Sequence, residues 1–199
     1  AVLSVGVRGE ELEYVWKRNG LVLPGVVRSE FAVGSVGFEE AGLYSVEAKN
    51  AVGKVESGPV GLWVKPRWVA EPTATVALAG SVVSLRGSAE GSGTMTYRWM
   101  RDGQWVSGAT GAGFEIGGDM AQEGRRVYRM EASGSGGTVL SREVAVEFQR
   151  AVAVVERPVD VWVRRGGSAV LGVRASGSAV RYQWKKAGSA IAGAVGAQL

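Results

Sequence analysis

The sequence predicts an all-β fold in which one small antiparallel sandwich recurs along the chain. Three observations support this prediction. Apolar and polar residues alternate over runs of about four to eight positions, which is the period of a half-buried strand. Tight-turn pairs, Asn19-Gly20 and Asp102-Gly103, interrupt these runs. One residue pattern returns about every 84 positions, which is too long for a solenoid repeat and suits a whole small domain.

The composition suits a packed fold and removes several kinds of site. Of the 199 residues, 46% are hydrophobic, which is enough for a core. The 31 glycines, with only 5 prolines, fit strands and turns better than collagen or a linker. Because cysteine and histidine are absent, disulfides, Cys/His zinc sites and triads or dyads that use these residues are excluded. We predict no metal and no cofactor.

The basic balance of the chain does not indicate a nucleic-acid partner. The formal net charge is +4 and the pI is about 9.6, values that would suit a nucleic-acid reader. However, residues 1–65 carry a net charge of −1, residues 66–150 carry 0, and residues 151–199 carry +5. The excess therefore lies wholly in the last segment, which has few acidic residues, and we predict no binding of nucleic acid.

The strongest repeat is an aromatic residue, one spacer and a tryptophan. It occurs in EYVWKRNGLVLPG, TYRWMRDGQWVSG and RYQWKKAGSAIAG, where two mostly charged residues and a turn ending in glycine follow the tryptophan. The tryptophans are Trp16, Trp99 and Trp184, which are 83 and 85 residues apart. Other stretches recur in the same order, such as GSVVSLRGSAEG and GSAVLGVRASG before the tryptophan. Each copy therefore reads as one domain of short strands joined by frequent turns.

These residues resemble immunoglobulin-like domains, and most closely the I-set-like repeats of bacterial surface and secreted proteins. The family has a strand-B cysteine, a strand-C tryptophan, and a corner tyrosine two residues before a strand-F cysteine. The three tryptophans match the strand-C position, and Tyr44 and Tyr128 match the corner tyrosine. The cysteine positions hold other residues, namely Val5, Gly87 and Val173 at the first, and Val46 and Met130 at the second.

The resemblance implies tandem Greek-key β-sandwiches without disulfides. A disulfide is typically worth about 2–4 kcal/mol, so packing around the tryptophan has to supply this stability. We expect the structural core to contain one set of residues: Trp16, Trp99, Trp184, Tyr44, Tyr128, Val5, Val46, Met130 and Val173. Gly87 departs from the pattern, because glycine fills little space.

Three domains are expected, of which the first and last are truncated. Residues 1–65 form a first repeat that lacks strand A, residues 66–150 a complete middle repeat, and residues 151–199 the N-terminal part of a third repeat. The connections KPRWVAEP and QRAVAVVERP are short and end in proline, which predicts semi-rigid junctions. The names first, middle and third repeat denote these ranges below.

No arrangement of acidic residues predicts catalysis. Carboxylate pairs occur at Glu10-Glu11, at Glu39-Glu40 and at Asp119 with Glu123, all on predicted loops or strand ends. A glycosidase needs two carboxylates that face each other across a cleft, and no loop of the EF-hand type is present. The glycine-rich stretch SGSGG lacks the spacing of a phosphate-binding loop and suits a hairpin turn.

Four tryptophans lie outside the predicted core. Trp63, Trp68 and Trp162 lie beside the domain junctions, and we expect them to pack between neighbouring repeats. Trp105 occurs in one copy only, where the others have valine or alanine. An exposed aromatic side chain can bind a sugar or a protein partner, so Trp105 is the candidate ligand contact.

The resemblance implies a non-catalytic structural or adhesive array, a spacer or binding region of an exported bacterial protein. Its expected location is extracellular or at the cell surface, and its expected partner is a protein or carbohydrate surface. The alternative is an accessory, carbohydrate-binding region of a larger secreted enzyme. No apolar run approaches the roughly 20 residues of a membrane span, so no membrane insertion is expected, and the first residues show no signal peptide.

Overall fold

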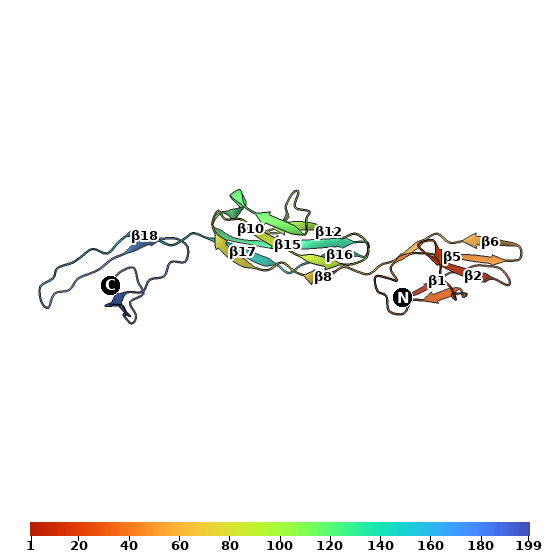
Figure 1. Ribbon diagram of the computed structural model, residues 1–199, viewed down its shortest axis with the longest axis horizontal. Coiled ribbons are helices and arrows are strands. Elements are labelled where there is room, and N and C mark those ends of the chain that lie inside the picture. The colour runs from red at the N-terminus through yellow and green to blue at the C-terminus, as the bar shows by residue number, and fades with distance from the viewer. The chain divides into compact units, whose positions relative to one another are not determined.

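The computed structural model describes residues 1–199, and its regular structure is almost entirely β (Figure 1). The single exception is a 3-10 turn at Gly118–Ala121. None of its helical segments has the length and hydropathy required to cross a membrane. The all-β prediction is therefore confirmed, as expected for a sequence in which alternating residues are interrupted by turn signals.

The chain forms two compact units. The first comprises residues 1–72, 86–114 and 128–143, and the second comprises residues 73–85, 115–127 and 144–199. Strand β15 (Gly124–Gly134) runs through both units, so the boundary passes within the middle repeat. The predicted domain limits near residues 65 and 150 accordingly stay a prediction.

The first repeat has two sheets. One pairs two short strands, and Leu3 lies opposite Phe31 in it. The other has the order β3-β2-β5-β6, with β7 also paired to β5, and Trp16 lies opposite Val46. All these pairs are antiparallel. The strands are β1 (Val2–Ser4), β2 (Glu13–Arg18), β3 (Leu21–Val22), β4 (Glu30–Ala32), β5 (Gly42–Asn50), β6 (Gly53–Glu56) and β7 (Val60–Leu62).

The middle repeat has a six-stranded sheet with the order β13-β12-β15-β17-β9, with β16 also paired to β15. The middle repeat also contains two separate two-stranded sheets, β10-β14 and β11-β8. Strand β9 runs parallel to β17, and Trp99 lies opposite Met130. The strands are β8 (Arg67–Ala70), β9 (Thr75–Leu78), β10 (Val83–Arg86), β11 (Ser88–Glu90), β12 (Thr96–Arg101), β13 (Gln104–Trp105), β14 (Gly113–Ile116), β15, β16 (Gly137–Leu140) and β17 (Val144–Gln149).

The third repeat contains four short strands and no fully buried residue. Strand β18 pairs with β19, and β20 pairs with β21 across a two-residue turn. Valine side chains that the alternation pattern would place inside a sandwich are open to solvent here. The strands are β18 (Ala153–Glu156), β19 (Arg174–Ser176), β20 (Lys185–Lys186) and β21 (Ser189–Ala190).

A cluster of tryptophan, phenylalanine and tyrosine forms the centre of each of the first two repeats. In the first repeat the Phe31 ring lies 5.9 Å from Trp16 and 6.0 Å from Tyr44, between ring centroids. In the middle repeat the Phe114 ring lies 5.7 Å from Trp99 and 6.0 Å from Tyr128. Such offset and tilted aromatic pairs add to the stability gained from burial. Neither phenylalanine was among the predicted core residues.

Each core tryptophan also makes the same hydrogen bond. The indole N–H donates to the backbone carbonyl twelve residues further along the chain in all three repeats. The pairs are Trp16 with Arg28 at 2.8 Å, Trp99 with Gly111 at 2.9 Å, and Trp184 with Gly196 at 3.0 Å. This bond satisfies the only polar atom of a large apolar side chain, so the ring can be buried without an unpaired donor.

The hairpin after each tryptophan turns where the sequence predicts it. The two turn residues have positive φ in every copy, as a tight hairpin of this twist requires. The first turn residue is at +51° in Asn19, +48° in Asp102 and +48° in Ala187, and glycine follows each. Asparagine and aspartate tolerate this conformation, whereas in alanine it brings the Cβ too close to the following carbonyl oxygen and costs free energy.

Candidate functional site

Trp105 lies on strand β13, at the edge of the six-stranded sheet, opposite Met100. Its side chain is 44% exposed. The guanidinium carbon of Arg98, on the neighbouring strand β12, lies 4.0 Å from the centre of the indole ring. A cation over a tryptophan face is worth about 0.5–1 kcal/mol at an exposed site. One face of the ring is therefore already occupied.

Glu131 on β15 fixes the position of Arg98. The guanidinium donates from Nε at 3.1 Å and from Nη2 at 2.8 Å, both to one carboxylate oxygen of Glu131. The Glu131 side chain is only 14% exposed, whereas that of Arg98 is 56% exposed. Trp105, Arg98 and Glu131 therefore form one row across three adjacent strands. A stacking ligand has to use the free face of Trp105 or displace Arg98.

The matching face of the first repeat carries ion pairs in place of an aromatic side chain. Lys17 lies 3.0 Å from Glu56 and 3.7 Å from Glu47, and Lys54 lies 3.2 Å from Glu47. The hydrogen bond to Glu56 raises the pKa of Lys17, and the hydrogen bonds from Lys17 and Ser45 lower the pKa of Glu56. Surface pairs of this kind contribute little stability.

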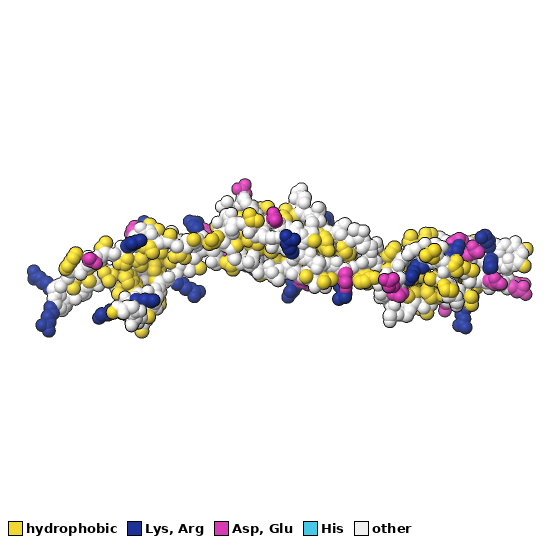
Figure 2. All heavy atoms as spheres, in the orientation of Figure 1, with side chains coloured by type: hydrophobic (Ala, Val, Ile, Leu, Met, Phe, Trp, Pro, Cys, Tyr) yellow, Lys and Arg dark blue, Asp and Glu magenta, His cyan; other side chains and the backbone are white.

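The predicted carboxylate pairs lie at turns and strand ends. The Glu40 side chain accepts the N–H of Gly37 at 2.8 Å, and its backbone carbonyl accepts the Tyr44 hydroxyl at 2.5 Å. Glu39 contributes a backbone carbonyl to Arg18, and Asp119 lies in the 3-10 turn. No group of three or more potential metal ligands occurs in the structure. Figure 2 likewise shows acidic side chains scattered among basic and neutral ones.

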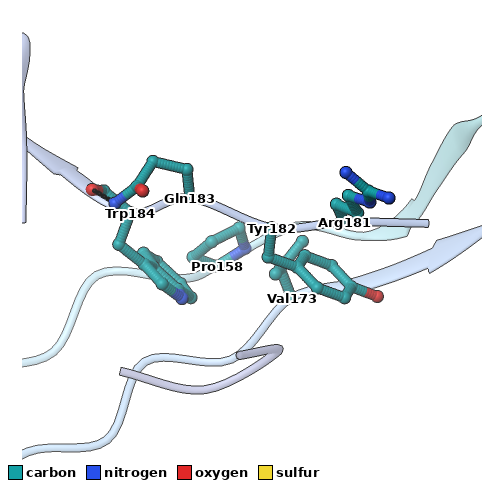
Figure 3. A pocket seen from close by; sticks show the side chains of 6 residues that line it. All are labelled: Pro158, Val173, Arg181, Tyr182, Gln183 and Trp184. Atoms are coloured by element: carbon teal, nitrogen blue, oxygen red, sulfur yellow. Dashed lines mark hydrogen bonds between the residues drawn. The ribbon is translucent and has the colours of Figure 1, made fainter. Parts of the chain in front are cut away.

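A cavity adjoins Trp184 in the third repeat (Figure 3). Its volume is about 290 Å³, and its lining residues are Pro158, Val173, Arg181, Tyr182, Gln183 and Trp184. The rings of Tyr182 and Trp184 point to one side of the chain, and Arg181 and Gln183 point to the other. This is the alternation of a strand with one apolar face. The cavity is open to solvent and has no carboxylate in its lining.

The two positions that hold cysteines in antibody-type domains are filled differently in each repeat. In the first repeat Val46 is 3% exposed and Val5 is half-buried. In the middle repeat Met130 is fully buried, and its sulfur lies 2.7 Å from the point where a Cβ on Gly87 would stand. The absence of a side chain at Gly87 therefore leaves the space that the Met130 side chain occupies. In the third repeat Val173 lines the open cavity.

Serine residues pair with the second of these positions, a feature that the sequence analysis missed. Ser141 is 1% exposed; its hydroxyl accepts the Met130 N–H at 2.9 Å, and its own N–H donates to the Met130 carbonyl at 2.8 Å. Ser57 makes the same two bonds with Val46, at 3.0 and 2.9 Å. The serine replaces a neighbouring strand where the strand pairing of β15 and β5 is interrupted. Its recurrence at an 84-residue spacing is visible in the sequence.

The remaining tryptophans differ from one another. Trp68 is half-buried, and its indole nitrogen is enclosed without a hydrogen-bond partner. Trp63 is 39% exposed and Trp162 is 87% exposed. The prediction that Trp162 packs between neighbouring repeats is therefore wrong, because almost all of its surface meets solvent.

Comparison with known proteins gives a likeness in fold. The structure resembles "I-band fragment I67-I69 from titin", with a TM-score of 0.54, 17% identity, and coverage of 92% of this chain and 71% of that chain. It also resembles "Sidekick-1 immunoglobulin domains 1-5", with a TM-score of 0.54, 18% identity, and coverage of 96% of this chain and 46% of that chain. No protein-family model matches the sequence, and a comparison with curated proteins gives no match. Together with the sheet topology, this likeness shows that the chain folds as tandem immunoglobulin-like β-sandwiches.

Proposed function

We propose that the chain is a non-catalytic array of immunoglobulin-like modules, a spacer or adhesive region of an exported bacterial protein. The observation that carries the proposal is where its specific side-chain interactions lie. The tryptophan hydrogen bonds, the aromatic clusters and the buried serines all stabilise the repeats themselves. Fold alone does not fix function, but the tandem immunoglobulin domains of the structural neighbours support a role as a modular scaffold.

Location tests this proposal directly. An antibody raised against residues 66–150 is applied to intact and to lysed cells of the organism that makes the protein, with a cytosolic protein as the control for leakage. We expect labelling of intact cells, or recovery in the medium, because the proposal requires export. Labelling that appears only after lysis contradicts it.

The alternative is a carbohydrate-binding accessory region of a secreted enzyme, and one observation favours it. Trp105 is an exposed aromatic residue at a position where the other repeats have valine or alanine, and Arg98 and Glu131 hold its surroundings in place. A rigid aromatic ring with adjacent hydrogen-bonding groups suits the face of a sugar. The charged row also suits a protein partner.

Binding measurements distinguish these possibilities. The purified chain is sedimented with insoluble cellulose, chitin and peptidoglycan, and Trp105→Ala is compared with Val22→Ala, the matched position of the first repeat. Sugar binding through Trp105 predicts a loss of about tenfold or more for Trp105→Ala, since truncating a central aromatic contact costs more than about 1 kcal/mol. Val22→Ala should bind like the unaltered chain. Equal binding by both variants excludes Trp105 as the contact.

A further inference from the structure

Each connection between successive repeats is tied to the repeat that follows it by a serine. At the first junction the N–H of Val64 donates to the Ser92 hydroxyl at 2.7 Å, and the N–H of Ser92 donates to the Val64 carbonyl at 3.1 Å. At the second junction Arg150 and Ser178 make the same two bonds, at 2.8 and 3.1 Å. In both places the serine closes a ring of two hydrogen bonds onto one residue at the C-terminal end of the preceding repeat.

The residues around these serines are also equivalent. Both partners are separated by 86 residues from their counterparts, Val64 from Arg150 and Ser92 from Ser178. A glycine precedes each serine, and the connection packs against it. A Cβ on Gly91 would stand 3.0 Å from Pro66, and a Cβ on Gly177 would stand 2.8 Å from Val152. Contacts this close to backbone atoms leave no room for a side chain at either glycine. The Gly-Ser pair therefore lets the connection pack directly against the following repeat.

The second junction has an additional ionic link. The carboxylate of Glu123, just before β15 in the middle repeat, accepts a hydrogen bond from the Ser178 hydroxyl and pairs with the guanidinium of Arg150. One carboxylate thus joins the middle repeat, the connection and the third repeat. At the first junction the place of Arg150 is taken by Val64, which carries no charge. Each junction also has an ion pair beside the serine, Arg67 with Glu90 at the first and Arg174 with Glu156 at the second. The two junctions therefore differ in the Glu123 carboxylate, which contacts the second serine and its partner directly, whereas the Val64–Ser92 hydrogen bonds have no charged partner.

We propose that the Gly-Ser pairs are junction latches of two kinds, a neutral latch at Val64 and Ser92 and an ionic latch at Glu123, Arg150 and Ser178. Both restrict movement of a repeat about its connection. Salt screens exposed charge pairs and leaves neutral hydrogen bonds almost unaffected. Ionic strength therefore loosens the second junction selectively. This proposal concerns the internal mechanics of the array and does not depend on what the array binds.

Hydrogen exchange of the whole 199-residue chain, followed by NMR, tests the latches one amide at a time. Ser178→Ala should speed exchange of the Arg150 amide by about tenfold, because it removes a hydrogen-bond acceptor worth about 1 kcal/mol or more. The Val64 amide should not respond. Ser92→Ala should have the reverse effect, and Ser178→Thr, which keeps the hydroxyl, should restore protection of Arg150.

The Ile191 amide, which bonds to the Trp184 carbonyl at 2.9 Å, reports whether the third repeat stays folded in each variant. If Ser178→Ala also speeds exchange of the Ile191 amide, the third repeat has opened in that variant, and Ser178→Thr is then used to test the latch. Protection of Arg150 in Ser178→Thr then supports the latch, and its loss overturns it. Unchanged exchange of Arg150 in Ser178→Ala also overturns it.

A salt series tests the difference between the two latches. Raising sodium chloride from about 0.05 to 0.5 M should speed exchange of the Arg150 and Ser178 amides several-fold, since the screening length falls from somewhat above about 10 Å to about 4 Å. The Val64 and Ser92 amides should change little. Glu123→Gln should reduce the salt response of Arg150 and Ser178 to that of Val64 and Ser92, whereas Glu71→Gln, which breaks an ion pair inside the middle repeat, should preserve the difference. An equal salt response at both junctions refutes the ionic latch.

Discussion

At the scale of single residues, the core of the middle repeat depends on complementary sizes at Gly87 and Met130. A Cβ at position 87 would meet the Met130 sulfur at 2.7 Å and the Pro72 side chain at 3.2 Å. Since Met130 is fully buried, its side chain has little room to retreat. A small residue and a long flexible one together fill the space that two valines fill in the first repeat.

This size complementarity predicts a non-additive pair of substitutions. Gly87→Ala should destabilise the chain by about 1–3 kcal/mol through overpacking, and Met130→Val should destabilise it by about 1 kcal/mol or more through a cavity. The double variant should be more stable than the sum of the two effects, because the added methyl group enters the space that Met130 leaves. Urea unfolding of the four proteins measures the coupling. Strict additivity would show that the two side chains do not share this space.

The Glu71–Arg142 pair predicts a pH dependence of stability. Hydrogen bonds from the Arg142 side chain at 2.7 Å and from its backbone N–H at 3.1 Å lower the pKa of Glu71 from its ordinary value of 4.5. The folded state therefore binds this proton more weakly than the unfolded state does. The stability contributed by the pair is complete above the unfolded pKa and is lost as the pH falls through the lower folded pKa.

The difference in midpoint of thermal unfolding between the unaltered chain and Glu71→Gln should accordingly be constant above about pH 5 and vanish in strong acid. Glu115→Gln is the control, because Glu115 is exposed on β14 and makes no ion pair. A difference that grows on acidification would mean that the pair does not contribute in the assigned direction.

At the scale of single elements, the hairpin of the third repeat has an unfavourable turn residue. Ala187 has φ at +48°, where the other copies have asparagine and aspartate. The left-handed conformation costs an alanine roughly 1–2 kcal/mol. Ala187→Asn should therefore stabilise this hairpin by about 1 kcal/mol and slow exchange of the Ile191 amide about fivefold. Exchange unchanged by this substitution would show that the turn does not limit opening of the hairpin.

The sequence predicts those elements in which the same residue type recurs at equivalent positions of the repeats. The tryptophans and the turn pairs recur as residue types, so the strands on either side of each turn could be predicted. Phe31 and Phe114 both lie fifteen residues after the tryptophan and could have been found by the same comparison. The indole hydrogen bonds could not, because their acceptors are backbone carbonyls of unrelated residues. Likewise, the role of Gly87 becomes visible only once the Met130 sulfur is placed.

At the scale of the whole molecule, the candidate contact at Trp105 could be predicted as an exposed aromatic residue, but not its surroundings. The pairing of Arg98 with both Trp105 and Glu131 depends on the alignment of three strands, of which β13 and β15 are distant in sequence. The serines at the two junctions were equally hidden. Serine is common on loops, and only the backbone of the connection shows what each one binds.

The distribution of buried side chains predicts how the repeats differ in stability. Ten buried apolar residues belong to the middle repeat: Leu85, Trp99, Ile116, Ala121, Tyr128, Met130, Ala132, Val144, Val146 and Phe148. The segment 151–199 contributes none, and Trp184 lines an open cavity there. Burial of apolar surface is the main term that offsets the loss of chain entropy. A segment without a buried core therefore lacks the driving force for independent folding.

Residues 66–150, produced alone, should accordingly unfold in one cooperative thermal transition, whereas residues 151–199 alone should show none. Circular dichroism and tryptophan fluorescence follow the two fragments separately. A two-state transition of the isolated segment 151–199 would show that its hairpin and short strands suffice for a core, and the limit near residue 150 would then separate two independent folding units.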